Sequence, residues 1–322
     1  MPLIDMPLEK LKLYKGITPK PKDFDKFWDR SLKDMRAEEP EIELIPATFK
    51  APFADCFDLF FTGAGDGSRI HAKLLIPKKP KGRLPAIVEF HGYSGDAGAW
   101  VDKLPYVAAG FVFAALDCRG QGGLSEDRGA VKGNTLYGHI IRGLDEKDPA
   151  KMLFRNIFLD CARLADIVSG LNCVDPGRLG AMGGSQGGAL TVACAGLVPQ
   201  IKMAAPAFPF LSDYRRIWEM DLAKDAYGDL KDYFRHFDPT HEHEDEIFMR
   251  LGYIDIQNLA PRIKAEVLWG LGLVDTICPP STQFAAYNKI KSKKRMEIYH
   301  DFGHEGLPGF NDKRFEFLMK LR

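Results

Sequence analysis

The chain has 322 residues, of which 45% are hydrophobic and 11% aromatic, so it is long enough to bury a large core. Its 44 basic and 44 acidic residues cancel, which excludes the overall positive charge of most proteins that bind nucleic acids or anionic membranes. No segment approaches the roughly 20 consecutive apolar residues of a membrane helix. We therefore expect a globular protein that acts on a small, roughly neutral molecule.

The cysteines are scattered through apolar contexts and form no CxxC pair. The first residues also lack the apolar stretch of a secretory signal. We expect reduced thiols in a cytoplasmic protein; three disulfides in an exported enzyme are the alternative. The cysteines are Cys56, Cys118, Cys161, Cys173, Cys194 and Cys278.

Residues 1–50 form a charged, proline-containing extension with one amphipathic stretch, DFDKFWDRSLKDMRAEE. Phe24, Phe27, Trp28 and Leu32 recur there at helical spacing, which predicts a helix lying on the core. Two β-type runs follow, joined by Gly-Asp-Gly-Ser, and predict a hairpin. The sheet is therefore expected to begin antiparallel.

Short apolar runs then alternate with helical stretches, and each run ends in glycine or a polar loop. Such runs are typical of parallel strands covered on both faces. The pattern predicts one three-layered α/β domain over residues 1–322, with a mostly parallel sheet flanked by helices. The runs are LPAIVEFHG, FVFAALDCRG, RLGAMGG, IKMAAPAFPF, AEVLWGLGL and RMEIYHDFG.

Two connections between these runs are too long for simple crossovers. The first, about residues 119–150, is polar and glycine-rich, and its end at Asp148-Pro149 predicts the start of a helix. The second, about residues 211–262, carries amphipathic patterns. We expect it to be a helical insertion over the sheet edge, before the strand that begins near residue 265.

The stretch LGAMGGSQGGALTV places one serine, Ser185, among five glycines. A phosphate-binding loop would need a nearby lysine, and a dinucleotide loop would need GxGxxG and an acidic residue about 20 positions later. Neither feature is present. The stretch instead matches GxSxG between a predicted strand and a predicted helix, which is typical of a nucleophile elbow. A tight glycine turn with an idle serine is the alternative.

A serine nucleophile needs a histidine base that is oriented by a carboxylate, and in this fold the acid precedes the histidine in the chain. The final strand pattern offers two histidines. His300 lies inside the pattern, whereas His304 follows Gly303 in the loop beyond it. Because catalytic groups usually lie on such loops, His304 is the predicted base.

Asp275 is the predicted acid, because it directly follows a buried strand and precedes Pro279 and Pro280. Asp301 is too close to His304 in the chain to orient its ring easily, and Asp255 lies before the strand. Asp275 could alternatively cap the next helix, although Ser281 or Thr282 could begin it instead.

The negative charge that develops on the substrate carbonyl needs two preorganised donors. The backbone N–H of Gln186, the residue after the nucleophile, supplies one in this fold. The loop HGYSG supplies the second, and we expect it to be the Tyr93 N–H.

The run THEHEDE bunches His241 and His243 with acidic residues and raises the alternative of metal-dependent hydrolysis. It lacks HExxH spacing and is polar throughout, so a solvated loop is favoured. No metal or organic cofactor is expected.

Three motifs in order, RGQGG at residues 119–123, GGSQGG around Ser185 and HE at His304-Glu305, give the chain a resemblance to the acetyl xylan esterase/cephalosporin C deacetylase family, which has an α/β-hydrolase fold. The resemblance implies Ser185, Asp275 and His304 as the triad and the Tyr93 and Gln186 N–H groups as the oxyanion hole. It also implies that Arg119, Gly120 and Gln121 brace the active-site loops. An arginine there could alternatively hold an anionic substrate group.

By the same resemblance, the protein is expected to be an intracellular hexamer that removes acetyl groups from small acetylated carbohydrates or cephalosporin C. The long loop and the insertion are candidates for subunit contacts. A serine peptidase, a broad esterase and a non-enzymatic binding protein on the same fold remain alternatives.

Overall fold

The computed structural model describes residues 4–80, 82–129 and 139–322. Within them, nine strands form one sheet in the order β1-β2-β3-β5-β4-β6-β7-β8-β9. The pairs β1–β2, β2–β3 and β3–β5 are antiparallel and the other five are parallel, which confirms the predicted α/β-hydrolase class. The strands are β1 Glu43–Pro46, β2 Ala54–Thr62, β3 Arg69–Pro77, β4 Leu84–Phe90, β5 Val112–Leu116, β6 Val174–Gly184, β7 Ile201–Ala207, β8 Glu266–Gly272 and β9 Lys294–Tyr299.

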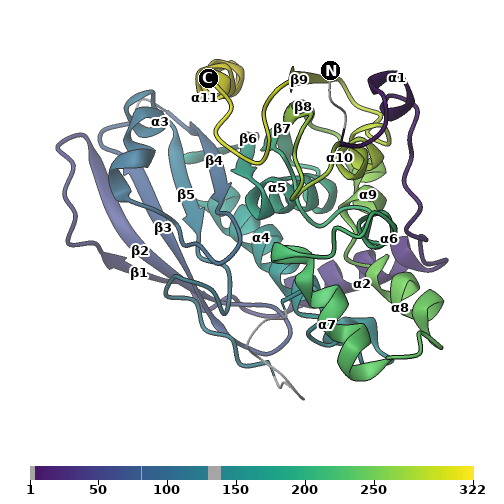
Figure 1. Ribbon diagram of the computed structural model, residues 1–322. Coiled ribbons are helices and arrows are strands. Elements are labelled where there is room, and N and C mark those ends of the chain that lie inside the picture. The colour runs from purple at the N-terminus through teal and green to yellow at the C-terminus, as the bar shows by residue number, and fades with distance from the viewer. Residues whose placement is uncertain (1–3, 81, 130–138) are drawn as a thin grey trace.

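Helices cover both faces of this sheet (Figure 1). Most of them, including α2, α4, α5 and the insertion, pack with the larger apolar cluster, and α3 and α11 pack with the smaller one on the opposite face. The helices are α1 Leu8–Leu11, α2 Phe24–Ala37, α3 Leu104–Ala108, α4 Leu153–Gly170, α5 Gln186–Leu197, α6 Tyr214–Glu219, α7 Gly228–Phe237, α8 Glu244–Leu251, α9 Ile256–Leu259, α10 Pro280–Tyr287 and α11 Phe310–Leu318.

The strand β5 shows why the central strands are apolar throughout. Val112, Ala114 and Leu116 face the larger cluster, whereas Phe113 and Ala115 face the smaller one. Successive side chains of a strand point to opposite faces, so a strand covered on both sides must be apolar at every position. This is the three-layer arrangement that the sequence predicted.

The predicted helix of the N-terminal extension is α2, and its apolar side chains are buried. The Trp28 ring stacks on Phe158 of α4 with centroids 5.8 Å apart, and its indole N–H donates to the Tyr253 carbonyl oxygen at 3.0 Å. The extension is therefore fixed both to the helical layer and to the C-terminal end of the insertion.

The first long connection departs from prediction at its C-terminal end. Asp148 accepts a hydrogen bond from the Ala150 N–H, but it caps a short 3₁₀ helix, Pro149–Lys151, rather than the long helix. Met152 is extended, and α4 begins only at Leu153. The predicted start signal was real, but it belongs to a separate turn. Residues 130–138 of this connection lie outside the described residues.

The second connection is helical, as predicted, and contains α6, α7, α8 and α9. It begins earlier than the strand pattern suggested, because β7 ends at Ala207 and Phe208 takes a positive φ of 32°. The chain therefore leaves the sheet beside Ser185, whose backbone N–H donates to the Ala207 carbonyl oxygen.

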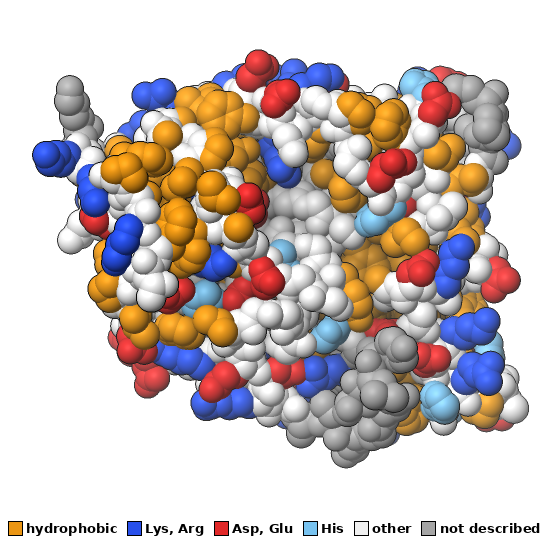
Figure 2. Space-filling model, turned by 60° about the vertical axis from the view of Figure 1, so that its left-hand side comes forward, with side chains coloured by type: hydrophobic (Ala, Val, Ile, Leu, Met, Phe, Trp, Pro, Cys, Tyr) orange, Lys and Arg blue, Asp and Glu red, His pale blue; other side chains and the backbone are white. Residues whose placement is uncertain are grey.

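Hydrophobic side chains gather over the side of the molecule that carries the antiparallel strands (Figure 2). Ile42, Leu44 and Ile45 in or beside the edge strand β1 are more than two-fifths exposed, and Val101 is also exposed. None of the described helices has the length and apolar character needed to cross a membrane.

Candidate active site

Ser185 lies at a sharp turn between the last residue of β6, Gly184, and the first residue of α5, Gln186. Its backbone angles, φ 56° and ψ −119°, are strained for a residue with a side chain. This is the strand-turn-helix context that the GxSxG motif predicted.

Glycines on both sides of Ser185 allow this turn to pack against its neighbours. A Cβ atom on Gly187 would lie 1.9 Å from the Phe90 carbonyl oxygen, and one on Gly183 would lie 2.4 Å from the Gly187 carbonyl oxygen. Both distances are far below contact distance, so any side chain would force α5 away from the sheet. The glycines therefore serve close packing of helix and strand, which answers why they surround the serine.

The loops after β8 and β9 bring a histidine and an acid to Ser185. His304 Nε2 lies 2.8 Å from Ser185 Oγ, and His304 Nδ1 lies 2.9 Å from Asp275 Oδ2. Asp275 is fully buried, whereas the His304 side chain is 20% exposed. The structure therefore brings together the three residues predicted as nucleophile, base and acid.

Backbone donors fix the orientation of the Asp275 carboxylate. Its Oδ1 accepts hydrogen bonds from the N–H groups of Ile277 and Cys278, at 2.9 and 2.8 Å, and this leaves Oδ2 for His304. Asp275 does not cap α10, because the N-terminal N–H of Ser281 instead donates to Asp5 Oδ2.

The other acids and histidines weighed from the sequence lie elsewhere. His300 and Asp301 are exposed in the turn after β9, so His300 follows the strand rather than lying in it. Asp255 is buried and caps α9, where its carboxylate accepts hydrogen bonds from the Asp213 N–H and from Gln257.

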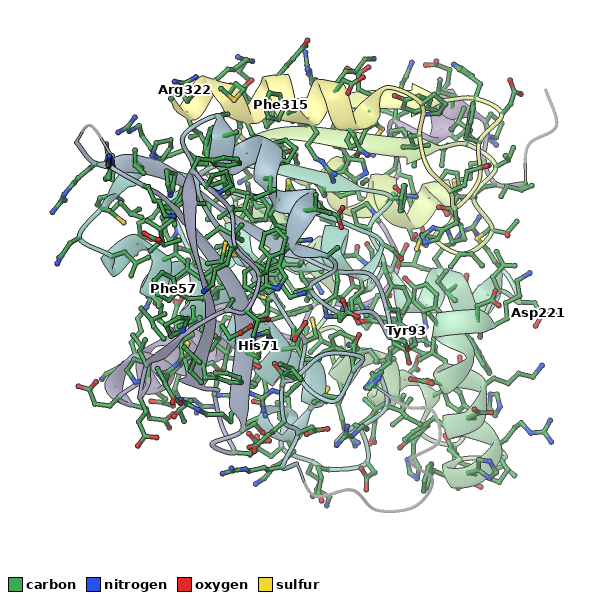
Figure 3. The ribbon with its side chains drawn as sticks, turned by 90° about the vertical axis from the view of Figure 1, so that its left-hand side faces the viewer. Phe57, His71, Tyr93, Asp221, Phe315 and Arg322 are labelled. Carbon is green, nitrogen blue, oxygen red and sulfur yellow. The ribbon has the colours of Figure 1, made fainter. Side chains whose placement is uncertain are left out.

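The two predicted oxyanion donors belong to neighbouring segments. Gln186 is the first residue of α5, where an N–H has no intrahelical acceptor. The Tyr93 loop runs beside it, since a Cβ on Gly92 would lie 4.0 Å from the Gly184 carbonyl oxygen. Tyr93, which Figure 3 labels, packs its ring edge-on against Phe210, so this loop also contacts the beginning of the insertion.

Gln121 connects these two segments. Its Oε1 accepts from the Ser94 N–H at 2.9 Å, and its amide exchanges two hydrogen bonds with the Gln186 side chain, at 2.9 and 3.0 Å. This partly buried amide pair makes both of its hydrogen bonds only in one relative placement of the two side chains. Gln121 thus holds the Tyr93 loop in register with the start of α5.

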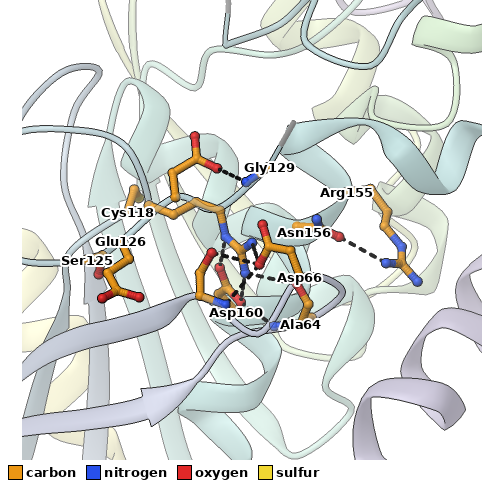
Figure 4. Close-up of polar contacts among 12 residues, drawn as sticks. Ala64, Asp66, Cys118, Ser125, Glu126, Gly129, Arg155, Asn156 and Asp160 are labelled. Atoms are coloured by element: carbon orange, nitrogen blue, oxygen red, sulfur yellow. Dashed lines mark hydrogen bonds and ion pairs between the residues drawn. The ribbon is translucent and has the colours of Figure 1, made fainter. Parts of the chain in front are cut away.

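Arg119 is fully buried, and Figure 4 labels its two acidic partners, Asp66 and Asp160. Its guanidinium makes a bidentate pair with Asp160, at 2.7 and 2.8 Å, and a further pair with Asp66 at 2.7 Å. Burial disfavours its charge, but these carboxylates outweigh that effect and raise the pKa of Arg119. With its charge matched and no surface exposed, Arg119 is not placed to bind an anionic substrate group.

Gly120 and Glu305 also have local structural contacts. Gly120 takes a φ of 67°, and a Cβ there would meet the Asp127 carboxylate at 2.9 Å. Glu305 Oε1 accepts a hydrogen bond from the Gly303 N–H at 2.9 Å, which closes the backbone around His304.

The run with His241 and His243 does not gather metal ligands. The His241 ring stacks on Phe234, with centroids 4.6 Å apart, and its Nδ1 contacts Glu244. Within the part of the chain that the structure describes, the one candidate group is Asp275, Cys278 and His304. Burial raises the pKa of the Cys278 thiol, and His304 Nδ1 already faces Asp275, so this group does not favour a metal.

Two features were not predicted from the sequence: the acidic partners of Arg119, and the buried residue Asp117 that contacts the Tyr93 loop. Asp160 lies in the apolar run IFLDCARLA, and an acid at such a position needs a buried partner. A buried partner for Asp160 could therefore have been predicted. The identity of that partner could not, because Arg119 and Asp160 are 41 residues apart.

Comparisons with known proteins show which proteins this chain is similar to. The acetyl xylan esterase 1 of Thermoanaerobacterium sp. JW/SL YS485 is 56% identical and superposes with a TM-score of 0.96, over 98% of this chain and 99% of that one. The acetyl xylan esterase of Paenibacillus sp. R4 is 37% identical with a TM-score of 0.92, over 98% and 99%.

A more distant relative is the acetyl esterase Axe7A of Xylanibacter ruminicola, which is 28% identical over 298 residues. The match covers 89% of this chain but only 64% of that protein's length. Oligopeptidase B from Leishmania major, 19% identical with a TM-score of 0.56, shares the fold alone. The family model for acetyl xylan esterase (AXE1) matches residues 1–321. The chain therefore belongs to the acetyl xylan esterase (AXE1) family of carboxylic ester hydrolases.

Proposed function

We propose that this protein is a serine carboxylesterase that removes acetyl groups from small acetylated carbohydrates through an acetyl-enzyme intermediate. One observation carries the proposal: Ser185 Oγ, His304 and Asp275 form a continuous hydrogen-bonded line, with contacts of 2.8 and 2.9 Å. Family membership supports acetyl esters as the substrate class.

In the first step, His304 Nε2 takes the Ser185 proton as Oγ attacks the acetyl carbonyl carbon. Asp275 stabilises the imidazolium and keeps the Nδ1 proton in place. The carbonyl oxygen becomes an oxyanion, which the Tyr93 and Gln186 N–H groups stabilise. His304 then protonates the departing sugar oxygen, and the acetyl group remains on Ser185.

In the second step, water attacks the acetyl-enzyme, and His304 acts again as base and then as acid. Acetate leaves and Ser185 regains its proton. This sequence uses only side chains and backbone N–H groups of this chain, so the proposal includes no metal or organic cofactor.

One aromatic side chain beside the Ser185 turn, Phe208, supports a small acyl group. The Phe208 ring lies edge-on to His304, with centroids 4.8 Å apart, and it would contact a Cβ on Gly184 at 3.4 Å. Because it packs so close to the reacting serine, we infer that long acyl chains are disfavoured. Acetylated xylo-oligosaccharides and cephalosporin C are the proposed substrates.

A homo-oligomer, with a hexamer as the family-based expectation, and a cytoplasmic location complete the proposal. The exposed apolar side chains around β1 support self-association. The six cysteines, all within the described ranges, are free thiols, which supports a reducing compartment.

The test is hydrolysis of acetylated xylo-oligosaccharides, cephalosporin C, aryl esters of increasing acyl length and an aminoacyl amide. We expect acetate release that falls steeply with acyl length and is absent in Ser185→Ala. Ser169→Ala is the matched control, because the Ser169 hydroxyl only donates to the Asp166 carbonyl oxygen within α4. A preference for long acyl esters or amides would overturn the substrate, and activity in Ser185→Ala would overturn the mechanism.

A further inference from the structure

A buried carboxylate behind the Tyr93 loop connects two active-site loops. Asp117 follows β5 and is 2% exposed. Its Oδ1 accepts from the Ala97 N–H at 2.6 Å, and its Oδ2 accepts from the Leu124 N–H at 2.8 Å. Ala97 belongs to the loop that carries Tyr93, and Leu124 belongs to the loop that carries Gln121. The Asp117 carboxylate therefore fixes one loop at Ala97 and the other at Leu124.

The glycine pair of RGQGG allows this contact. A Cβ on Gly123 would lie 2.0 Å from the Asp117 carboxyl carbon, and one on Gly122 would lie 3.0 Å from the carbonyl oxygens of Ser94 and Gly95. The Gly122 N–H also donates to the Gly95 carbonyl oxygen at 2.9 Å. The loop that carries Gln121 thus packs directly on the Asp117 carboxylate and on the Tyr93 loop.

His71 of β3 holds the other side of Asp117. Its Nδ1 lies 2.6 Å from Asp117 Oδ2, and its Nε2 lies 3.1 Å from Asp58 Oδ1. The His71 ring is itself buried and packs on Phe60, with centroids 4.9 Å apart. His71 therefore has little freedom to turn, and it limits the movement of the carboxylate.

The backbone strengthens this connection. The Asp117 N–H donates to the His71 carbonyl oxygen at 2.9 Å, and the Ser125 hydroxyl accepts from the His71 N–H and donates to the Asp117 carbonyl oxygen. Burial opposes the charge of Asp117, but hydrogen bonds from His71, Leu124 and Ala97 outweigh it and hold the carboxyl pKa below its usual value. The carboxylate is thus kept as an acceptor.

We propose that Asp117, held by His71, is a positioning residue that sets the Tyr93 N–H against the oxyanion. Figure 3 shows His71 on the strand side and Tyr93 on the loop toward the insertion, and Asp117 acts between them through Ala97. Neither Asp117 nor His71 touches the reacting atoms. The inference rests on the proposed function, because it assumes an oxyanion at the Tyr93 N–H.

The decisive variant is Asp117→Asn. In either orientation of the new amide, an NH₂ group would face the N–H of Ala97 or Leu124, and one loop would lose its acceptor. Because the oxyanion contact forms only in the transition state, we expect kcat for an aryl acetate to fall about 10- to 100-fold with little change in KM. We also expect faster amide exchange in residues 92–98 and 122–125.

Asp213→Asn is the matched control for general destabilisation. Asp213 is also buried, and its Oδ1 also accepts two backbone N–H groups, those of Ile17 and Thr18. We expect wild-type kcat in this variant. An equal loss of kcat in both variants at similar melting temperatures, or wild-type kcat in Asp117→Asn, would overturn the inference.

Two variants of His71 give a second, sharper comparison. His71→Asn keeps a donor at the δ position toward Asp117, whereas His71→Gln moves the donor to the ε position toward Asp58. We expect the asparagine variant to recover most of the kcat that the glutamine variant loses. Equal activity in the two variants would contradict the role of the Asp117 contact.

The outcomes separate this inference from the proposed function. If the wild type hydrolyses no acetyl ester, the proposed function fails, and amide exchange still decides whether Asp117 fixes the loops. If the wild type is active and Asp117→Asn matches it in both kcat and exchange, only the positioning role fails.

Discussion

The turn that carries Ser185 and the loop that carries His304 meet at one hydrogen bond, but they are held in different ways. The turn is strained, and Gly183 and Gly187 leave no space for a Cβ atom between α5 and the neighbouring strands. The loop is held by side chains: Asp275 fixes the ring, Phe208 lies against it, and Glu305 closes the backbone. Packing therefore fixes Ser185, the proposed nucleophile, whereas side-chain contacts fix His304, the proposed base. Substitutions should damage the two regions to different extents.

Ser185→Ala tests the turn at its reacting atom. We expect the rate of acetyl ester hydrolysis to fall by a factor on the order of 10⁴ or more, because the proposed mechanism forms the acyl intermediate on Ser185 Oγ. The variant should fold, since the Ser185 hydroxyl has only His304 as a partner within the described residues. Stopped-flow or burst measurements with an aryl acetate, together with a melting curve, would check both points.

Asp275→Asn tests the buried carboxylate that fixes the ring of His304. The asparagine oxygen would stay with the Ile277 and Cys278 N–H groups, so its NH₂ would face His304 Nδ1. The ring proton would then move to Nε2, which could no longer accept the Ser185 proton. We expect kcat to fall about 10³- to 10⁴-fold with KM nearly unchanged. A loss below tenfold in a steady-state assay would argue against Asp275 as the orienting acid.

Gly187→Ala tests the packing of the turn. Its Cβ would lie 1.9 Å from the Phe90 carbonyl oxygen, so helix α5 must move, and we expect a loss of about 3 kcal/mol in the free energy of unfolding. Gly170→Ala, where a Cβ has open space, is the control and should be neutral or slightly stabilising. Urea unfolding measures both. Equal stability of the two variants would show that α5 adapts and that packing does not fix the turn.

Glu305→Ala tests the hydrogen bond that closes the His304 loop. The Gly303 N–H would lose an exposed acceptor, which water can replace. A net loss near 1 kcal/mol in the placement of His304 corresponds to a kcat about fivefold lower. Glu305→Gln keeps an oxygen acceptor and should retain wild-type kcat in the same assay. If both variants lose equally, the charge of Glu305 matters rather than this hydrogen bond.

His91, which directly follows β4, should make the stability of the folded chain depend on pH. Burial lowers the pKa of His91 below its usual 6.5, and its Nε2 accepts from the Cys118 N–H at 2.9 Å, as a neutral ring requires. Below pH 6.5 the unfolded chain binds a proton that the folded chain excludes, so stability falls as the pH falls. In His91→Gln, which retains an acceptor, urea unfolding between pH 7 and pH 5 should show a smaller fall. An identical fall would place the effect at another group.

Much of the fold could be predicted from short patterns. The β2–β3 hairpin, the apolar parallel strands and the helix α2 are all present where the sequence indicated them. The boundary errors have local causes: Asp148 caps a 3₁₀ turn rather than α4, and the positive φ of Phe208 ends β7 early. Both boundaries depend on local backbone conformation, which the pattern of hydrophobic residues does not predict.

The three main residues of the proposed site could be predicted from their order in the chain and their positions at strand ends. Ser185, Asp275 and His304 follow strands whose carboxyl ends share one edge of the sheet, so their meeting was expected. The supporting contacts were not. In the sequence, Asp117 is simply the residue after a predicted strand. Nothing nearby in the chain indicates that its carboxylate accepts hydrogen bonds from both Ala97 and Leu124.

The sequence by itself determined the order of strands and helices, the strained turn at Ser185 and the side chains that a serine hydrolase requires, because each depends on residues within a few positions of one another. Only the tertiary structure decided which partners these side chains have. Ser185 and His304 are 119 residues apart, Arg119 and Asp160 are 41 apart, and His71 and Asp117 are 46 apart. The order of strands in the sheet sets those contacts, and that order follows from how the whole chain buries its apolar faces.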